Sequence, residues 1–135
     1  MRYRYLSYRY TVTAPGTSWS FGDVWERERL RGLLRDRWRP DADVYETESA
    51  VEVVVDLAGV DEDDFEILLF EDTLVVEGRR EPASRAADAT YYAVGIRQGP
   101  FRVELPLPAV VDARHVQARY DRGLLLVTLP KRASR

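Results

Sequence analysis

The stretch ARYDRGLLLVTLP, residues 118–130, decides the fold because it reads as two strands joined by a tight turn. Residues 121–123 supply the turn, since Gly123 can adopt a positive φ without steric cost. The second strand alternates apolar residues on both of its faces. They are Leu125, Val127 and Leu129 on one face, and Leu124 and Leu126 on the other. We therefore expect another part of this chain, or another molecule, to cover the outer face of this strand.

The composition narrows the class of protein. The 135 residues suffice for one domain of ordinary size plus an arm. The absence of cysteine excludes disulfides, thiol catalysis and thiolate metal sites, and it suits a reducing compartment. The sequence shows no signal peptide and no apolar run long enough to span a bilayer. We expect a cytoplasmic protein that does not enter a membrane.

Charge and aromatic residues divide the chain into two regions. Residues 1–40 hold nine arginines and four acidic residues, a balance of +5, whereas residues 41–135 have a balance of -8. Eight of the fifteen aromatic residues also precede residue 41. This shift in composition predicts an arginine- and aromatic-rich arm over residues 1–40 and a domain over 41–131, followed by a short tail, 132–135.

Short alternating strands separated by turn signals run along the domain. The inward positions of two of these strands are Val51, Val53, Val55 and Leu57, and Phe65, Ile67 and Leu69. This pattern predicts an all-β fold, an antiparallel immunoglobulin-like β-sandwich. In the arm, apolar residues recur at helical spacing between Gly22 and Arg37, so we expect a partly helical or disordered arm.

Five motifs resemble the α-crystallin domain of small heat shock proteins. In chain order they are WRPDADVYE at 38–46, DLAGV at 56–60, TLVVEGRR at 73–80, Leu107-Pro108, and ARYDRGLL at 118–125 with its following Leu129-Pro130-Lys131. The signature residues of the last motif are Ala118, Gly123, Leu124 and Leu125. The resemblance covers residues 38–131. It implies a stress-response chaperone that holds unfolded client proteins without ATP.

The sequence departs from the family's pattern near two subunit contacts. It ends four residues after Lys131 without the I-x-I/V motif, which docks in a groove of a neighbouring subunit in this family. We therefore expect a homodimer or small homo-oligomer rather than a large cage. Gly95 and Val103 stand where the family usually places a Glu and an Arg that pair near the dimer contact. Because both partners are absent, we expect the dimer to rely on apolar contacts.

Several apolar residues fall on the solvent-side phase of their strands. They are Val54, Leu68, Phe70, Val75, Leu124 and Leu126. One interpretation is that a partner subunit covers them, or that the arm does so through Trp19, Phe21 and Trp25. The other is that part of this face is intermittently uncovered and holds unfolded chains. We take these nine residues as candidate client-binding residues. Replacing Leu68 and Phe70 with Ser is then expected to weaken suppression of aggregation while leaving far-UV circular dichroism unchanged.

The loop 81–89 and an expected strand at 91–96 resemble the dimerisation segment of bacterial and plant family members. In those proteins a strand is exchanged between protomers, and the small residues of this loop suit a long connector. The candidate dimer-interface residues are Tyr91, Tyr92, Val94 and Ile96. The alternative is a surface hairpin of the same domain.

Two other functions compete with the chaperone hypothesis. A β-sandwich can act as an interaction module that binds one folded partner, as CS-domain co-chaperones do. Nucleic-acid binding could use Arg2, Arg4 and Arg9 with the tyrosines at 3, 5, 8 and 10, because such residues contact phosphates and stack on bases. The acidic domain and the lack of a nucleic-acid motif argue against it. We expect this segment to pack on the domain, on sister arms or on clients.

Residues suited to catalysis or metal binding are few. His115 is the only histidine, no nucleophile elbow or Gly-rich phosphate loop is present, and the acidic run 61–64 lacks calcium-loop spacing. We therefore expect no enzymatic activity, no cofactor and no metal.

Overall fold

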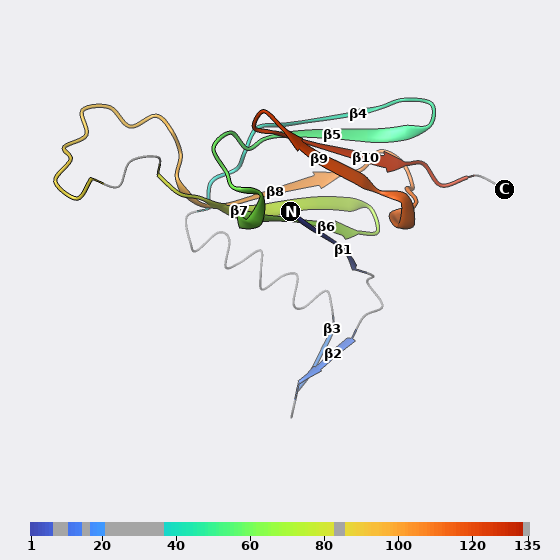
Figure 1. The fold of residues 1–135 in the computed structure, drawn as a ribbon. Helices are drawn as coiled ribbons and strands as arrows, with labels where there is room; N and C mark the ends of the chain where they lie inside the picture. Colours follow the sequence, from blue (N-terminus) through green and yellow to red (C-terminus); the bar gives the residue numbers. More distant parts are fainter. Residues whose placement is uncertain (7–10, 15–16, 21–36, 83–85, 134–135) are drawn as a thin grey trace.

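The computed structural model describes residues 1–6, 11–14, 17–20, 37–82 and 86–133, and strands dominate these ranges (Figure 1). The strands are β1 (Arg2–Leu6), β2 (Thr11–Ala14), β3 (Thr17–Ser20), β4 (Ala42–Glu46), β5 (Ala50–Asp56), β6 (Phe65–Phe70), β7 (Thr73–Arg80), β8 (Gly99–Pro106), β9 (Gln117–Asp121) and β10 (Leu124–Pro130). Two short 3-10 helices, η1 (Glu62–Asp64) and η2 (Ala113–His115), lie before β6 and β9. The helix expected between Gly22 and Arg37 lies outside the described residues, apart from its last position.

Two four-stranded sheets pack face to face (Figure 1). The first, here called the β6 sheet, has the order β1-β6-β7-β8, and the second, the β10 sheet, has the order β4-β5-β10-β9. All pairs within them are antiparallel except β1 with β6, which is parallel. Strands β2 and β3 pair with each other in a separate hairpin. The predicted all-β sandwich is confirmed, with a parallel edge strand that the sequence did not suggest.

The core lies between the two sheets and follows the predicted alternation. The inward residues of β5, β6 and β10 are buried, and they include Val51, Val53, Val55, Phe65, Ile67, Leu69, Leu125, Val127 and Leu129. The predicted turn before β10 is also present, with φ of +51° at Arg122 and +82° at Gly123. A Cβ at Gly123 would lie 2.8 Å from the Cα of Ala58, so this signature glycine also permits a close approach to the DLAGV turn.

Motifs that are far apart in the sequence meet around Arg80. Its guanidinium donates hydrogen bonds to the carbonyl oxygens of Ala58 (3.1 Å) and Arg97 (2.9 Å from Nε), and it lies 4.3 Å from the centre of the Trp38 ring. The Trp38 indole in turn donates to the carbonyl oxygen of Gly99 at 3.1 Å. A guanidinium satisfies several acceptors and an aromatic face at once because it is planar and has five donors. Arg80, the last residue of the TLVVEGRR motif, therefore joins the start of the domain to the start of β8.

None of the helices in the described ranges has the length and apolarity that crossing a bilayer requires.

Candidate functional surfaces

The six apolar residues expected on one outer face lie on two opposite faces. Leu68 and Val75 are cross-strand partners in the β6 sheet, whereas Leu126 and Val54 are partners in the β10 sheet. The core separates the two sheets, so their outer faces point away from each other (Figure 1). The structure therefore provides two candidate surfaces rather than one continuous surface.

The outer face of the β6 sheet is covered at its apolar positions. Leu68, Phe70 and Val75 are 5%, 3% and 0% exposed, and they form a second hydrophobic cluster against which Leu6 of β1 packs. Burial of these three residues agrees with the expectation that another part of the chain covers their outward side, and Leu6 is the described residue that packs there. Trp19 belongs to β3 by its backbone, but its side chain lies outside the described residues, as do Phe21 and Trp25.

The outer face of the β10 sheet remains accessible. Leu124 is 41% exposed, and Val54 and Leu126 are partly exposed beside it. We call these three residues the apolar strip. Leu126 and the exposed Tyr45 also line a hollow of about 680 Å³. The remaining lining residues are Glu52, Gln117, Ala118, Arg119 and Thr128. An apolar strip beside a hollow is a surface on which an extended apolar segment can bury area.

The candidate dimer segment does not form a strand within the single chain. The described parts of the connection between β7 and β8, residues 81–82 and 86–98, project beyond the ends of the sheets (Figure 1). Its apolar side chains are exposed, with values of 64% for Tyr91, 96% for Tyr92, 78% for Val94 and 68% for Ile96. The strand expected at 91–96 is absent because no neighbouring edge of the described chain pairs with these residues.

The N-terminal segment is built into the β6 sheet as β1. The guanidinium groups of Arg2 and Arg4 donate to the carboxylate of Glu66 at 3.1 and 3.0 Å. The Tyr3 hydroxyl donates to the carbonyl oxygen of Ala113 at 3.0 Å, and its ring packs against the core. Burial raises the pKa of Tyr3 to about 12. Residues 1–6 pack on the domain, one of the three expected places, but the sequence did not identify β6 as their partner. Tyr8, Arg9 and Tyr10 lie outside the described residues.

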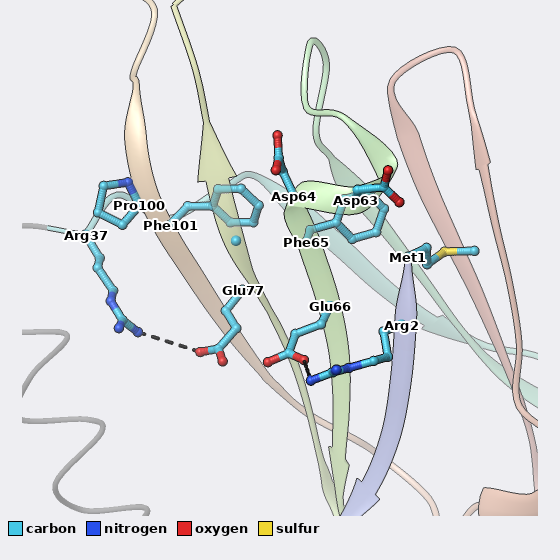
Figure 2. A pocket seen from close by; sticks show the side chains of 11 residues that line it. Met1, Arg2, Arg37, Asp63, Asp64, Phe65, Glu66, Glu77, Pro100 and Phe101 are labelled. Atoms are coloured by element: carbon cyan, nitrogen blue, oxygen red, sulfur yellow. Dashed lines mark hydrogen bonds and ion pairs between the residues drawn. The ribbon is translucent and has the colours of Figure 1, made fainter.

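A row of charged residues crosses the outer face of the β6 sheet beside this strand. Arg2, Glu66, Glu77 and Arg102 are successive cross-strand partners on β1, β6, β7 and β8. Figure 2 shows the two glutamates side by side, with Arg2 and Arg37 reaching them from opposite sides, next to a pocket of about 530 Å³. Arg102 donates to Glu77 at 2.9 Å, and Arg37 lies 3.6 Å from the same carboxylate.

Burial is the main cause of the raised pKa of Glu77. The charge of Arg102 lowers this pKa, whereas the neighbouring Glu66 raises it further. Paired carboxylates can serve acid–base chemistry, but here each carboxylate is engaged by arginines. The ion pairs of this row therefore help to hold the strands of the β6 sheet together. The sequence did not indicate the row, because its members come from four separate strands.

The remaining polar candidates show no constellation for catalysis. His115 Nδ1 lies 2.7 Å from Asp112 Oδ2, with both groups exposed. Hydrogen bonds from His115 and from the backbone N–H of Arg114 lower the pKa of Asp112. The acidic run forms η1, where the Asp61 carboxylate accepts from the backbone N–H of Asp63 at 3.0 Å. Within the ranges that the structure covers, no group of three or more His, Cys, Asp or Glu could hold a metal ion.

Known proteins resemble this chain in both sequence and fold. Spore protein SP21 of Stigmatella aurantiaca is 40% identical over 93 residues, which are 69% of this chain and 55% of that protein. Heat shock protein 16 of Schizosaccharomyces pombe is 30% identical over 105 residues, 76% of this chain and 73% of that protein. The chain spans 55–60% of the length of the first three curated relatives.

Solved structures match the same region. Heat shock protein 16.0 from Schizosaccharomyces pombe superposes with a TM-score of 0.65 at 28% identity, covering 73% of this chain and 96% of that one. A small heat-shock protein from Xylella fastidiosa gives 0.65 at 28% identity and covers 73% and 91%. The model of the Hsp20/alpha crystallin family matches residues 43–135. This chain therefore belongs to the Hsp20/alpha crystallin family, to which small heat shock proteins belong.

Proposed function

We propose that this chain is an ATP-independent holdase of the cytoplasm. It binds apolar segments of proteins that unfold under stress and slows their aggregation, because bound segments no longer meet one another. The observation that carries the proposal is the accessible apolar strip, Val54, Leu124 and Leu126, next to the hollow beside Tyr45. Burying apolar area there contributes about 25 cal/mol per Å² before the entropic cost of association, and it requires no particular client sequence.

The arm provides a second part of the proposed client surface. Trp19, Phe21 and Trp25 combine a large contact area with low sequence specificity, which suits adhesion to varied clients. Leu68, Phe70 and Val75 are covered, so they would contribute only when the cover of the β6 sheet is displaced.

We also propose that the working unit is a homodimer, or a small homo-oligomer, formed through Tyr91, Tyr92, Val94 and Ile96. Their exposure supports this proposal, since four large exposed side chains on one segment offer apolar area that a partner edge could bury. Arg102 is engaged by Glu77 within its own chain, and Val103 lies in the core. Apolar contacts would therefore replace the ionic pair that the family usually places near this interface.

Light scattering of a heat-denatured test enzyme, with and without ATP, tests the holdase proposal. We expect suppression of aggregation without ATP and a loss of about half of it in the Leu124→Ser/Leu126→Ser variant, since the strip loses most of its apolar area. Val110→Ser is the matched control, because Val110 is 64% exposed on the loop after β8 and away from the strip.

Dependence on ATP, or equal suppression by the double variant and the wild type, would contradict the proposal. A defined 1:1 complex with one folded protein and no binding of denatured enzyme would favour the interaction-module alternative instead.

A further inference from the structure

The outer face of the β10 sheet has an excess of negative charge around the apolar strip. On the outer face of the β6 sheet, by contrast, arginines engage both Glu66 and Glu77. The two outer faces of the sandwich therefore differ in charge as well as in cover. The charged side chains at the outward positions of the β10 sheet are four carboxylates, Asp43, Glu52, Asp56 and Asp121, and one guanidinium, Arg119.

Three of these carboxylates are cross-strand neighbours of residues in the strip. Asp56 and Asp121 are the two cross-strand partners of Leu124, one on each side of it. Asp43 is the partner of Val54 on the edge strand β4. Directly opposed residues of an antiparallel pair have Cβ atoms about 5 Å apart, so any segment that packs on the strip also lies beside these carboxylates.

The aspartates on β4 and β5 are exposed and, within the ranges that the structure describes, are not neutralised by an arginine or lysine. Asp43 has no ion pair there, and Asp56 accepts a hydrogen bond from the backbone N–H of Ala58 at 3.2 Å. The remaining aspartate, Asp121, lies 3.6 Å from the guanidinium of Arg122, which is 90% exposed. A segment that packs on the strip displaces water from these carboxylates, which costs free energy unless the segment brings a cation.

The hollow beside the strip offers a further place for a cation. Tyr45 and Glu52, which are cross-strand partners, line it together with Leu126. The Glu52 carboxylate accepts from the Thr128 hydroxyl at 2.8 Å and has further acceptor sites, since a carboxylate has about four. An arginine side chain in the hollow can therefore pair with Glu52 and stack on the exposed Tyr45 ring. Arg119 lines the β9 side of the hollow, so we expect the incoming cation on the β4 side.

We propose that the outer face of the β10 sheet binds extended client segments in which arginine or lysine accompanies apolar residues, and that it rejects acidic segments. This inference rests on the proposed holdase function and names the class of client that the strip takes. In an extended segment, residues i and i+2 point the same way about 7 Å apart, which is also the spacing of Val54 and Asp56 along β5. The long stems of arginine and lysine add apolar contact while their charged ends reach the carboxylates. Acidic segments meet repulsion at the same positions.

Rhodamine-labelled peptides of equal length test this preference by fluorescence anisotropy. In three peptides leucine alternates with arginine, with glutamine or with glutamate, so that the apolar content is constant. At about 50 mM salt we expect the arginine peptide to bind about tenfold more tightly than the glutamine peptide, and the glutamate peptide to bind more weakly than both. Because the ion pairs would be exposed, the advantage of the arginine peptide should fall to about twofold in about 0.5 M salt.

The Asp43→Asn/Asp56→Asn variant removes the two unneutralised charges and keeps the size of both side chains. It should weaken binding of the arginine peptide about tenfold and leave binding of the glutamine peptide unchanged. Asp63→Asn/Asp64→Asn is the matched control, because it changes the net charge equally at exposed residues of η1, outside the β10 sheet. Equal affinities for the arginine and glutamate peptides, or equal weakening by the two double variants, would overturn the proposal.

The Leu124→Ser/Leu126→Ser variant tests whether the peptides bind on the strip itself. It should weaken binding of the arginine and glutamine peptides by the same factor, because both lose the same apolar contact. Unchanged binding of the arginine peptide would place the site elsewhere and overturn the inference. Suppression of aggregation is measured on the same preparations. A preference for arginine without suppression would refute the holdase proposal alone, whereas suppression without that preference would refute only the client class inferred here.

Discussion

Gly78 is a residue at which the sandwich has no room for a side chain. A Cβ there would lie 2.1 Å from the carbonyl oxygen of Asp64 and 2.7 Å from the Cα of Phe65. Both atoms belong to the backbone, which cannot rotate away as a side chain can. We predict that Gly78→Ala lowers the free energy of unfolding by about 3 kcal/mol, measured by urea denaturation.

Gly95→Ala is the matched control for that prediction. A Cβ at Gly95 meets nothing within 4 Å, so its effect on stability should stay below about 0.5 kcal/mol. Similar losses in the two variants would contradict the steric explanation. The close approach at Gly78 also accounts for the glycine of the TLVVEGRR motif in physical terms.

The buried hydroxyl of Tyr3 predicts a loss of stability in alkali. Burial raises its pKa from 10.0 to about 12, so the folded state retains a proton that the unfolded state releases earlier. This contribution is fully present below pH 10 and is lost as the pH rises to about 12. Titration of tyrosinate absorbance should show a late step that is smaller in Tyr3→Phe.

Tyr120→Phe is a second variant for this titration, because it should also reduce the late step. The Tyr120 hydroxyl donates to the carbonyl oxygens of Leu57 and Val60 at 2.6 and 2.8 Å, and burial raises its pKa as well. Each variant should therefore remove its own share of the late titration. An unchanged step in Tyr3→Phe would show that the Tyr3 hydroxyl is not buried.

At the scale of single elements, periodicity predicted the strands whose partners lie close in the sequence. For residues 118–130 the predicted strand pair, its turn and its inward-facing residues all agree with the structure, because the alternation of side chains follows directly from the pleat of a strand. The partner of β1 could not be predicted, since Arg2–Leu6 pairs with a strand some sixty residues away. The segment 91–96 has strand-like composition but no partner within the described chain, so composition alone overpredicted it.

The exposed segment gives a prediction about assembly. Val94→Asp should shift the solution mass from dimer towards monomer at micromolar concentration, because burying an unpaired carboxylate at an apolar contact is costly. Sedimentation equilibrium measures this shift. Val110→Asp, at a similarly exposed site outside the segment, should leave the mass unchanged. A Val94→Asp protein that remains fully dimeric would place the interface elsewhere.

At the scale of the whole molecule, the division between basic arm and acidic domain could be predicted, and part of it is visible in the ion pairs of Arg2 and Arg4 with Glu66. Which outer face is covered could not be predicted, because alternation gives the phase of a side chain but not what packs over it. Leu68 and Leu126 have the same phase in the sequence pattern, yet only Leu68 is buried.

This difference changes the outcome expected for serine variants of the β6 sheet. Leu68 and Phe70 pack with Val75 and Leu6, so Leu68→Ser/Phe70→Ser removes buried volume and places hydroxyls in an apolar cluster. We predict a loss of about 4 kcal/mol in the free energy of unfolding, measured by urea denaturation, rather than a selective loss of chaperone activity. Leu124→Ser/Leu126→Ser should change stability by only about 1 kcal/mol, because these residues are already partly exposed. If the β6-sheet variant instead keeps its urea midpoint and loses suppression of aggregation, that face is the client surface, and its cover must open when clients bind.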